Sequence, residues 1–272
     1  MADPALREAI ATGTVVVAPG VYDLISALVA DRMGFRALYV TGYGTVASHL
    51  GLPDAGIATL TDMVGRVGQI CRMTKTPVIA DADTGYGGLL NVQHTVRCYE
   101  EAGVSAIQLE DQEFPKKCGH TPGRRVVPAD EMARKIAVAV ETRTSDDLLV
   151  IARTDARTGL GLEEAIRRGA LYARAGADVV FVESPESEAE LAEIADRIEK
   201  PVLANMTNGG RTPILPAERL EALGFALAIY PGAGFLAAAA ALETVYADLR
   251  EHGTTTDRAP LYSFEAFNRL IG

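Results

Sequence analysis

The chain has 272 residues, of which 48% are hydrophobic, which is enough for a domain with a sizeable buried core. Acidic residues outnumber basic residues by 36 to 26, a balance that speaks against a nucleic-acid-binding protein. Three widely spaced cysteines, a polar N-terminus and the lack of an apolar run of membrane-spanning length predict a cytoplasmic protein with no membrane partner.

Short runs of branched apolar residues alternate with helical patterns along the chain. In chain order, we expect strands at 14–20, 37–42, 77–83, 106–112, 148–154, 179–184, 201–207 and 227–232. Helical patterns are expected at 91–102, 129–141, 162–175, 188–198 and 235–251. This alternation predicts a closed (βα)₈ barrel of the TIM type, forming a single domain over residues 1–272. An open doubly wound sheet is the alternative.

Two connections are unusually long for such a barrel. Residues 43–60 follow the second expected strand and residues 113–127 follow the fourth, and both contain glycine. Long loops of this kind are often functional lids. The C-terminal segment SFEAFNRLIG has too few apolar residues to stand alone, so we expect it to dock on this subunit or on another.

Carboxylates gather where the active site of a barrel lies, at the C-terminal ends of the strands. The third expected strand ends in Asp81 and Asp83, whose spacing of two places both on one side, while Glu110 ends the fourth and Asp54 follows the second. Such like charges are costly without a cation, and oxygen ligands suit Mg²⁺ or Mn²⁺ better than zinc. The alternative is that individual acids cap helices or pair with Arg153.

The loop after the fourth strand contains the segment Lys116-Lys117-Cys118-Gly119-His120. Neighbouring cations lower the pKa of a thiol, so Cys118 is a candidate proton donor or nucleophile. Gly119 would let the loop fold over a bound anion, and the lysines would neutralise carboxylates. The alternative is a solvated basic loop with an incidental cysteine.

Other strand ends carry groups that bind anions or that close the top of the barrel by hydrogen bonds. Arg153 can form a bidentate pair with a carboxylate. The remaining candidates are Glu183, Asn205, Thr207 and the segment Thr41-Gly42-Tyr43-Gly44, which offers backbone N–H groups.

These motifs resemble one family when taken together. The segments YVTGYG, LGLPD, DADTGYG, LEDQ, KKCGH, ARTDA and ANMT occur in the order found in the isocitrate lyase/phosphoenolpyruvate mutase superfamily, over roughly residues 15–253. KKCGH is similar to the lyase branch, whose members cleave methylisocitrate, dimethylmalate, alkylmalates or oxaloacetate. The resemblance also implies a homotetramer in which the C-terminal helix is exchanged between subunits.

The resemblance implies a role for each candidate residue. Asp81 would bind Mg²⁺ most directly, with Mn²⁺ as a substitute, and the metal-bound waters would be held by Asp54, Asp83 and Glu110. Cys118 would be the catalytic acid and Tyr39 would lie near the reacting hydroxyl. The 2-oxo-acid or 2-hydroxy-acid end of the substrate would be received by Thr41, Gly42 and Tyr43, and its carboxylates by Arg153, Glu183, Asn205 and Thr207. The charge that develops would be stabilised by Lys116, Lys117, His120 and Arg153.

Two residues depart from methylisocitrate lyase. Tyr43 stands where that enzyme has a glycine, and Gln108 stands where it has a histidine. A tyrosine at this position is similar to the alkylmalate-cleaving and oxaloacetate-cleaving enzymes and is expected to narrow the pocket. We therefore expect a Mg²⁺-dependent lyase that cleaves a 2-hydroxy dicarboxylate or tricarboxylate to a 2-oxo acid, such as pyruvate, and a second carboxylate. The alternatives are a hydrolase that converts oxaloacetate to oxalate and acetate, and a non-catalytic oligomeric binding barrel.

Overall fold

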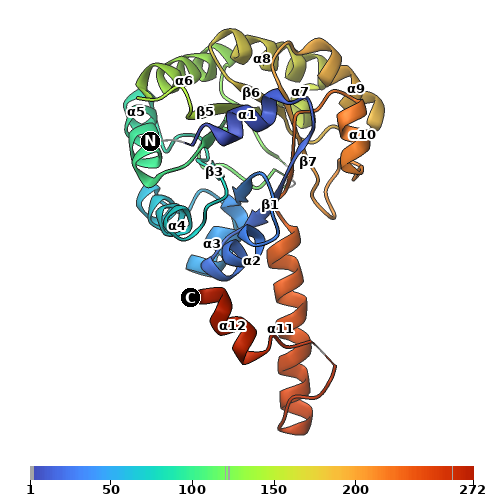
Figure 1. Cartoon of the computed structure of the whole chain (residues 1–272). Coiled ribbons are helices and arrows are strands. Elements are labelled where there is room, and N and C mark those ends of the chain that lie inside the picture. The colour runs from blue at the N-terminus through green and yellow to red at the C-terminus, as the bar shows by residue number, and fades with distance from the viewer. Residues whose placement is uncertain (1–2, 120, 122, 259) are drawn as a thin grey trace.

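The computed structural model of the chain describes residues 3–119, 121, 123–258 and 260–272. Its centre is a closed barrel in which each strand pairs in parallel with the next and β8 returns to β1 (Figure 1). The strands are β1 (Val16–Val21), β2 (Leu38–Val40), β3 (Val78–Asp81), β4 (Ala106–Glu110), β5 (Leu149–Thr154), β6 (Val179–Val182), β7 (Val202–Asn205) and β8 (Leu227–Tyr230). The predicted (βα)₈ barrel is confirmed, and the open sheet is excluded.

Helices surround the barrel and extend below it in the view of Figure 1. They are α1 (Ala5–Ala11), α2 (Leu24–Asp31), α3 (Gly42–Leu50), α4 (Leu60–Met73), α5 (Leu89–Ala102), α6 (Ala129–Thr142), α7 (Ala156–Leu160), α8 (Leu162–Arg174), α9 (Glu188–Arg197), α10 (Ala217–Ala222), α11 (Ala233–His252) and α12 (Phe264–Ile271). All eight expected strands and all five expected helical patterns are present, with ends that differ by a few residues. Six of the expected strands end two residues beyond the observed strand, the first ends one residue before Val21, and the fifth ends at Thr154 as observed.

The barrel is solid because successive strand side chains point alternately inward and outward. One buried cluster fills the interior and includes Leu6 of α1, so α1 closes one end of the barrel. Two further clusters lie between the sheet and the surrounding helices. The opposite end, where the strands finish, remains available for a site.

The structure corrects the prediction of a loop at residues 43–60. Helix α3 begins at Gly42, directly after β2, and the side-chain oxygen of Thr41 caps it by accepting from the Gly44 N–H at 3.5 Å. The helix ends at Leu50, and the cap residue Gly51 that follows has a left-handed φ of 65°. Gly42 and Gly44, together with the Thr41 cap, form a helix N-terminus at the end of a strand.

The structure also corrects the argument that put Asp81 and Asp83 on one face of a strand. Strand β3 ends at Asp81, and Asp83 has a left-handed φ of 48°. The Asp83 N–H donates to the Asp81 carboxylate at 3.1 Å. The two acids are therefore brought together by a tight turn rather than by strand alternation.

The C-terminal helices behave differently from the barrel helices. Helix α11 projects away from the barrel (Figure 1), and Asp248 is the one buried residue of its 20. Helix α12 returns to α2, where Leu270 is buried and the Arg32 guanidinium donates to the Arg269 carbonyl. The C-terminal segment thus docks on its own barrel, while α11 leaves apolar side chains exposed, namely Leu236, Leu242, Tyr246 and Leu249.

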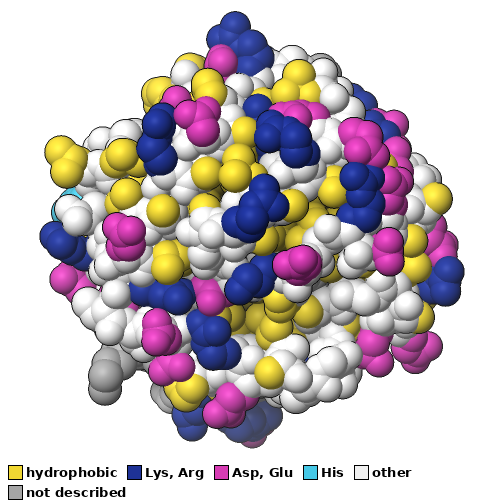
Figure 2. Space-filling model, turned by 90° about the horizontal axis from the view of Figure 1, so that it is seen from above, with side chains coloured by type: hydrophobic (Ala, Val, Ile, Leu, Met, Phe, Trp, Pro, Cys, Tyr) yellow, Lys and Arg dark blue, Asp and Glu magenta, His cyan; other side chains and the backbone are white. Residues whose placement is uncertain are grey.

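The molecular surface in Figure 2 carries Lys and Arg side chains interspersed with Asp and Glu. This face therefore has no continuous basic stripe of the kind that binds nucleic acid. Within the described part of the chain, no helix combines the length and the apolar character needed to span a membrane.

Candidate active site

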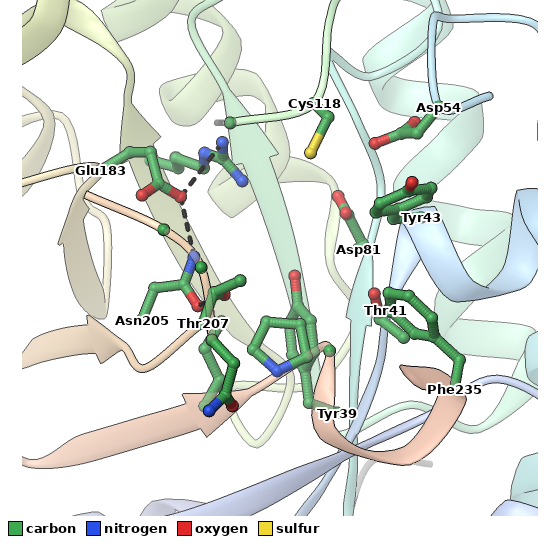
Figure 3. A pocket seen from close by; sticks show the side chains of 18 of the residues that line it. Tyr39, Thr41, Tyr43, Asp54, Asp81, Cys118, Glu183, Asn205, Thr207 and Phe235 are labelled. Atoms are coloured by element: carbon green, nitrogen blue, oxygen red, sulfur yellow. Dashed lines mark hydrogen bonds and ion pairs between the residues drawn. The ribbon is translucent and has the colours of Figure 1, made fainter. Parts of the chain in front are cut away.

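A cavity of about 230 Å³ opens at the C-terminal ends of the strands (Figure 3). It brings together most of the predicted site residues, from segments far apart in the chain: Tyr39, Thr41, Tyr43, Asp54, Asp81, Glu110, Lys116, Lys117, Cys118, Gly119, Arg153, Glu183, Asn205 and Thr207. Gly42 and Asp83 lie just behind the wall, in contact with Asp81 and Lys116 respectively. His120 lies outside the described residues.

The acidic side of the cavity holds buried carboxylates that lie close enough to repel one another. Burial raises the pKa of Asp83 to about 6, even though the Lys116 ammonium acts to lower it. Burial likewise raises the pKa of Glu110 well above its usual value, against the effect of Arg153. Both shifts show that negative charge is costly here, which is the electrostatic setting that favours a bound cation.

Lys116 is a buried counter-ion for this acidic side. Its Nζ lies 2.6 Å from a carboxylate oxygen of Asp54 and 2.7 Å from one of Asp83. Lys116 was expected to neutralise carboxylates and to stabilise charge on the substrate, and in the structure its ammonium pairs with two carboxylates of the protein. Lys117 Nζ donates to the Gly123 carbonyl at 3.1 Å, within its own loop.

The residues present fit a magnesium ion held largely through water. In the described ranges, no three His, Cys, Asp or Glu side chains are placed to ligate one ion directly. Glu110 Oε1 is nevertheless buried with no hydrogen-bond partner among the described residues. A Cβ atom on Gly42 would lie 2.6 Å from Asp81 Oδ2, so the absence of a side chain there keeps this oxygen accessible. Mg²⁺ commonly takes one or two carboxylates and keeps several waters, which matches this donor set.

The cationic side of the cavity is built on Arg153, at the end of β5. Its guanidinium donates twice to Asp155, at 2.9 Å from Nε and 2.9 Å from Nη2. It also lies 3.3 Å from Glu183 and 3.5 Å from Glu110. Although burial acts to lower it, the pKa of Arg153 is raised well above its usual value by these carboxylates. Arg153 therefore stays charged at the cavity wall.

Hydrogen bonds fix the residues beside Arg153. Asn205 Nδ2 donates to Glu183 at 3.0 Å, and the Thr207 hydroxyl donates to Asn205 Oδ1 at 2.7 Å (Figure 3). The Ser184 N–H donates to the other Glu183 oxygen at 2.7 Å. These contacts hold the polar groups in fixed orientations, so the groups would not need to reorganise when a carboxylate binds.

Tyr39 places a phenol at the floor of the cavity. The residue is 2% exposed, and burial, reinforced by Asp81, raises the pKa of its phenol well above the usual value. The phenol therefore keeps its proton at neutral pH.

The loop after β4 folds over the cavity. The side chain of Gln112 bonds the loop backbone at Lys117, accepting from its N–H at 3.0 Å and donating to its carbonyl at 2.8 Å. The Cys118 N–H donates to the Asp54 carbonyl at 3.1 Å, and its thiol points into the cavity near Asp81 (Figure 3). A Cβ atom on Gly119 would collide with Arg153 and Glu183, so only glycine lets the loop approach this closely.

The sequence analysis missed the apolar part of the cavity. Phe235 and Leu236, from the first turn of α11, and Pro231, after β8, line one side. The rings of Phe235 and Tyr43 lie with centroids 5.1 Å apart. Phe235 lies within a helical apolar pattern, which carries no signal that separates a pocket residue from a packing residue. Asp155 was also missed, although it follows Arg153 by two residues.

Comparison with known proteins identifies the family. The family model described as phosphoenolpyruvate phosphomutase matches residues 6–250. A 2,3-dimethylmalate lyase of Eubacterium barkeri is 50% identical over 268 residues, covering 98% of this chain and 93% of the relative. A 2-methylisocitrate lyase of Aeropyrum pernix is 44% identical, covering 98% and 86%.

Solved structures that superpose on this chain include enzymes of related kinds. A 2,3-dimethylmalate lyase superposes with a TM-score of 0.94 at 39% identity, covering 100% of this chain and 92% of that chain. An oxaloacetate acetylhydrolase with 3,3-difluorooxalacetate gives 0.93 at 39%, covering 98% and 92%. A phosphonopyruvate hydrolase with oxalate and Mg²⁺ gives 0.89 at 31%, covering 99% and 95%. The chain therefore belongs to the phosphoenolpyruvate mutase/isocitrate lyase superfamily, as its motifs and its barrel indicate.

Proposed function

We propose that the protein is a Mg²⁺-dependent carbon–carbon lyase acting on a 2-hydroxy dicarboxylate of the 2-alkylmalate or dimethylmalate type. The products are a 2-oxo acid, such as pyruvate, and a second carboxylate. The observation that carries this proposal is a single cavity lined by Asp54, Asp81 and Glu110, by Arg153, and by Cys118 of the covering loop. The lyases among the relatives support the same reaction class.

Each residue would have a role that follows from its position in the cavity. Thr41 and Gly42 begin α3, whose N-terminal N–H groups would receive the C1 carboxylate. Asp81, with Asp54, Asp83 and Glu110 around it, would hold Mg²⁺, which would supply Lewis acidity toward the substrate hydroxyl. The protonated phenol of Tyr39 would donate to the oxygen at C2, and Arg153 would pair with the distant carboxylate.

Cleavage then proceeds by a retro-aldol type of step. The C2 hydroxyl gives its proton to a carboxylate on the acidic side of the cavity, which acts as the general base. The hydroxyl oxygen then forms the carbonyl of the 2-oxo acid, and the C2–C3 bond breaks. The electron pair of that bond passes to C3, whose charge is delocalised into the adjacent carboxylate held by Arg153. The Cys118 thiol delivers a proton to C3 and completes the second product.

The apolar side of the cavity favours an alkyl-bearing dicarboxylate. Tyr43, Phe235 and Pro231 present carbon where a third carboxylate would need a cation, and oxaloacetate carries no alkyl group to use this surface. Hydrolysis of oxaloacetate remains the competing reaction, since a neighbour with this fold is an oxaloacetate acetylhydrolase.

Product analysis tests the proposal. Purified protein is incubated with dimethylmalate, 2-alkylmalates, 2-methylisocitrate or oxaloacetate, and pyruvate, oxalate and acetate are measured. We expect pyruvate from an alkylmalate or dimethylmalate. Oxalate and acetate from oxaloacetate as the dominant products would identify the hydrolase, and no turnover of any compound would favour the non-catalytic barrel.

Metal removal should abolish this activity. The acids of the cavity repel one another, and without a divalent cation the substrate carboxylate and hydroxyl would enter a negatively charged site. We expect no detectable turnover in excess EDTA, with recovery on adding Mg²⁺ and also with Mn²⁺. Full turnover by protein shown to be metal-free would contradict the proposal.

Substrate ranking should follow the ring of Tyr43. We expect kcat/KM to be higher for alkylmalates and dimethylmalate than for 2-methylisocitrate. In the Tyr43→Gly variant the preference should shift toward 2-methylisocitrate by roughly tenfold or more, the scale of steric discrimination in a pocket. The ring of Tyr22 also lies beside Phe235, with centroids 6.2 Å apart. The Tyr22→Phe variant keeps this ring and serves as a control. An unchanged ranking in Tyr43→Gly would remove this ring from the specificity of the site.

We also propose a homotetramer in which α11 packs against neighbouring subunits. The helix leaves Leu242, Tyr246 and Leu249 exposed and has one buried residue in its own chain. Exposed apolar side chains that gather along one helix are typical of a subunit interface. Sedimentation at micromolar concentration should therefore give a tetramer, and the Tyr246→Glu/Leu249→Glu variant should give smaller species. A monomeric wild-type protein would contradict this assembly.

A further inference from the structure

A second buried cation holds the far end of the loop that covers the cavity. The side chain of Arg124 is 2% exposed and forms an ion pair with Asp155. Its guanidinium also donates to the Thr158 hydroxyl at 2.6 Å and to the Ser184 hydroxyl at 3.4 Å. The Ser184 hydroxyl in turn donates to the Gly119 carbonyl at 3.3 Å. Arg124 is thus linked through Ser184 to the segment that carries Cys118.

The partner of Arg124 is the same carboxylate that holds Arg153. Asp155 accepts two hydrogen bonds from Arg153, and its backbone N–H is fixed by Asp111 at 2.8 Å. Asp111 is itself held by Arg168 at 3.0 Å and by Tyr172 at 2.8 Å. Asp155 is therefore a rigid anion between two arginines, one from the barrel and one from the loop.

The charge balance around Arg153 depends on whether Arg124 is present. Arg153 faces Asp155, Glu110 and Glu183, so three carboxylates compete for one guanidinium. When Arg124 shares Asp155, part of that competition is removed, and Arg153 attracts an incoming carboxylate more strongly. When the loop and Arg124 move away, Asp155 has Arg153 as its sole close cation among the described residues, and Arg153 is more fully neutralised.

We propose that Arg124 is a positioning residue that couples closure of the 113–127 loop to the anion affinity of Arg153, acting through Asp155. Arg124 does not line the cavity itself. Closure would therefore bring the Cys118 acid over the substrate and strengthen the hold of Arg153 on its carboxylate in a single movement. This inference rests on the carboxylate-binding role of Arg153 in the proposed function.

Adjacent arginines in the loop provide a matched experiment. Arg124→Gln removes the buried charge, Arg124→Lys retains a charge, and Arg125→Gln alters a side chain that is 79% exposed and pairs with Glu113 at the surface. For each we would measure kcat and KM with the best substrate. We would also follow iodoacetamide labelling of Cys118 by peptide mass spectrometry, with and without oxalate and Mg²⁺, using Cys98 as an internal reference.

We expect Arg124→Gln to raise KM by roughly tenfold or more, the scale of one weakened charge-assisted contact. Labelling of Cys118 should quicken, and oxalate should lose its protective effect. Arg124→Lys should restore most of both properties, and Arg125→Gln should match the wild type. Should Arg124→Gln fail to fold, Thr158→Val removes one anchor of Arg124 and should shift both readouts in the same direction.

Unchanged KM and unchanged Cys118 labelling in a folded Arg124→Gln or Thr158→Val protein would overturn the inference, even if thermal stability fell. The proposed reaction can fail separately. If the wild type cleaves none of the substrates while Arg124→Gln still loses oxalate protection of Cys118, the coupling stands and the reaction does not.

Discussion

Replacing Cys118 by serine is expected to lower kcat by a factor of roughly 10² or more, the scale of general acid catalysis. Serine keeps the size of the side chain but raises the pKa of the acid by several units, so protonation of the carbon becomes slow. KM should change little, because the substrate carboxylates are held by Arg153 and by the start of α3. Steady-state kinetics with the best substrate would measure both constants.

Cys98 provides the control for this prediction. It lies on α5, next to His94 at 3.6 Å and away from the cavity, so Cys98→Ser should keep wild-type kinetics. A Cys118→Ser enzyme that turns over its best substrate at the wild-type rate would remove Cys118 from the mechanism and leave its loop with a covering role alone.

Replacing Arg153 by methionine is expected to affect both activity and stability. The change leaves Glu110 and Glu183 buried without their nearest cation, and Asp155 with Arg124 alone. Breaking a buried ion pair by removing one partner typically costs about 3–5 kcal/mol in the free energy of unfolding. Turnover should be lost as well, since Arg153 would hold the substrate carboxylate. Denaturant unfolding and kinetic assays would measure the two effects.

The loss of stability in Arg153→Met should depend on pH in a defined direction. Burial already raises the pKa of Glu110 against the effect of Arg153, so without Arg153 this pKa should rise further and the variant is penalised when Glu110 is ionised. The penalty is therefore largest at high pH and shrinks as pH falls and Glu110 takes up a proton. The exposed Arg167, which pairs with Glu164, is the control, and Arg167→Met should cost no more than about 1 kcal/mol. A stability difference for Arg153→Met that grows toward low pH would contradict the argument.

Much of the fold and most of the site follow from local patterns. Alternating apolar strands and amphipathic helices specify a parallel barrel, because few other arrangements bury both faces of such strands. Once the barrel is inferred, residues at strand ends such as Asp81, Glu110 and Arg153 must converge, since all strands finish at one end. For that reason the strand pattern by itself places residues as far apart in the chain as Tyr39 and Thr207 at one cavity.

The partners of those residues could not be inferred in the same way. Lys116 pairs with Asp54 and Asp83, and Arg124 shares Asp155 with Arg153, because loops from different strand ends meet over the cavity. A buried charge pairs with the counter-ion that the folded backbone places within about 3 Å of it. Which residue that is depends on three-dimensional contacts and not on spacing along the chain. Phe235 lines the cavity for the same reason. Its neighbours there depend on how the chain turns from β8 into α11.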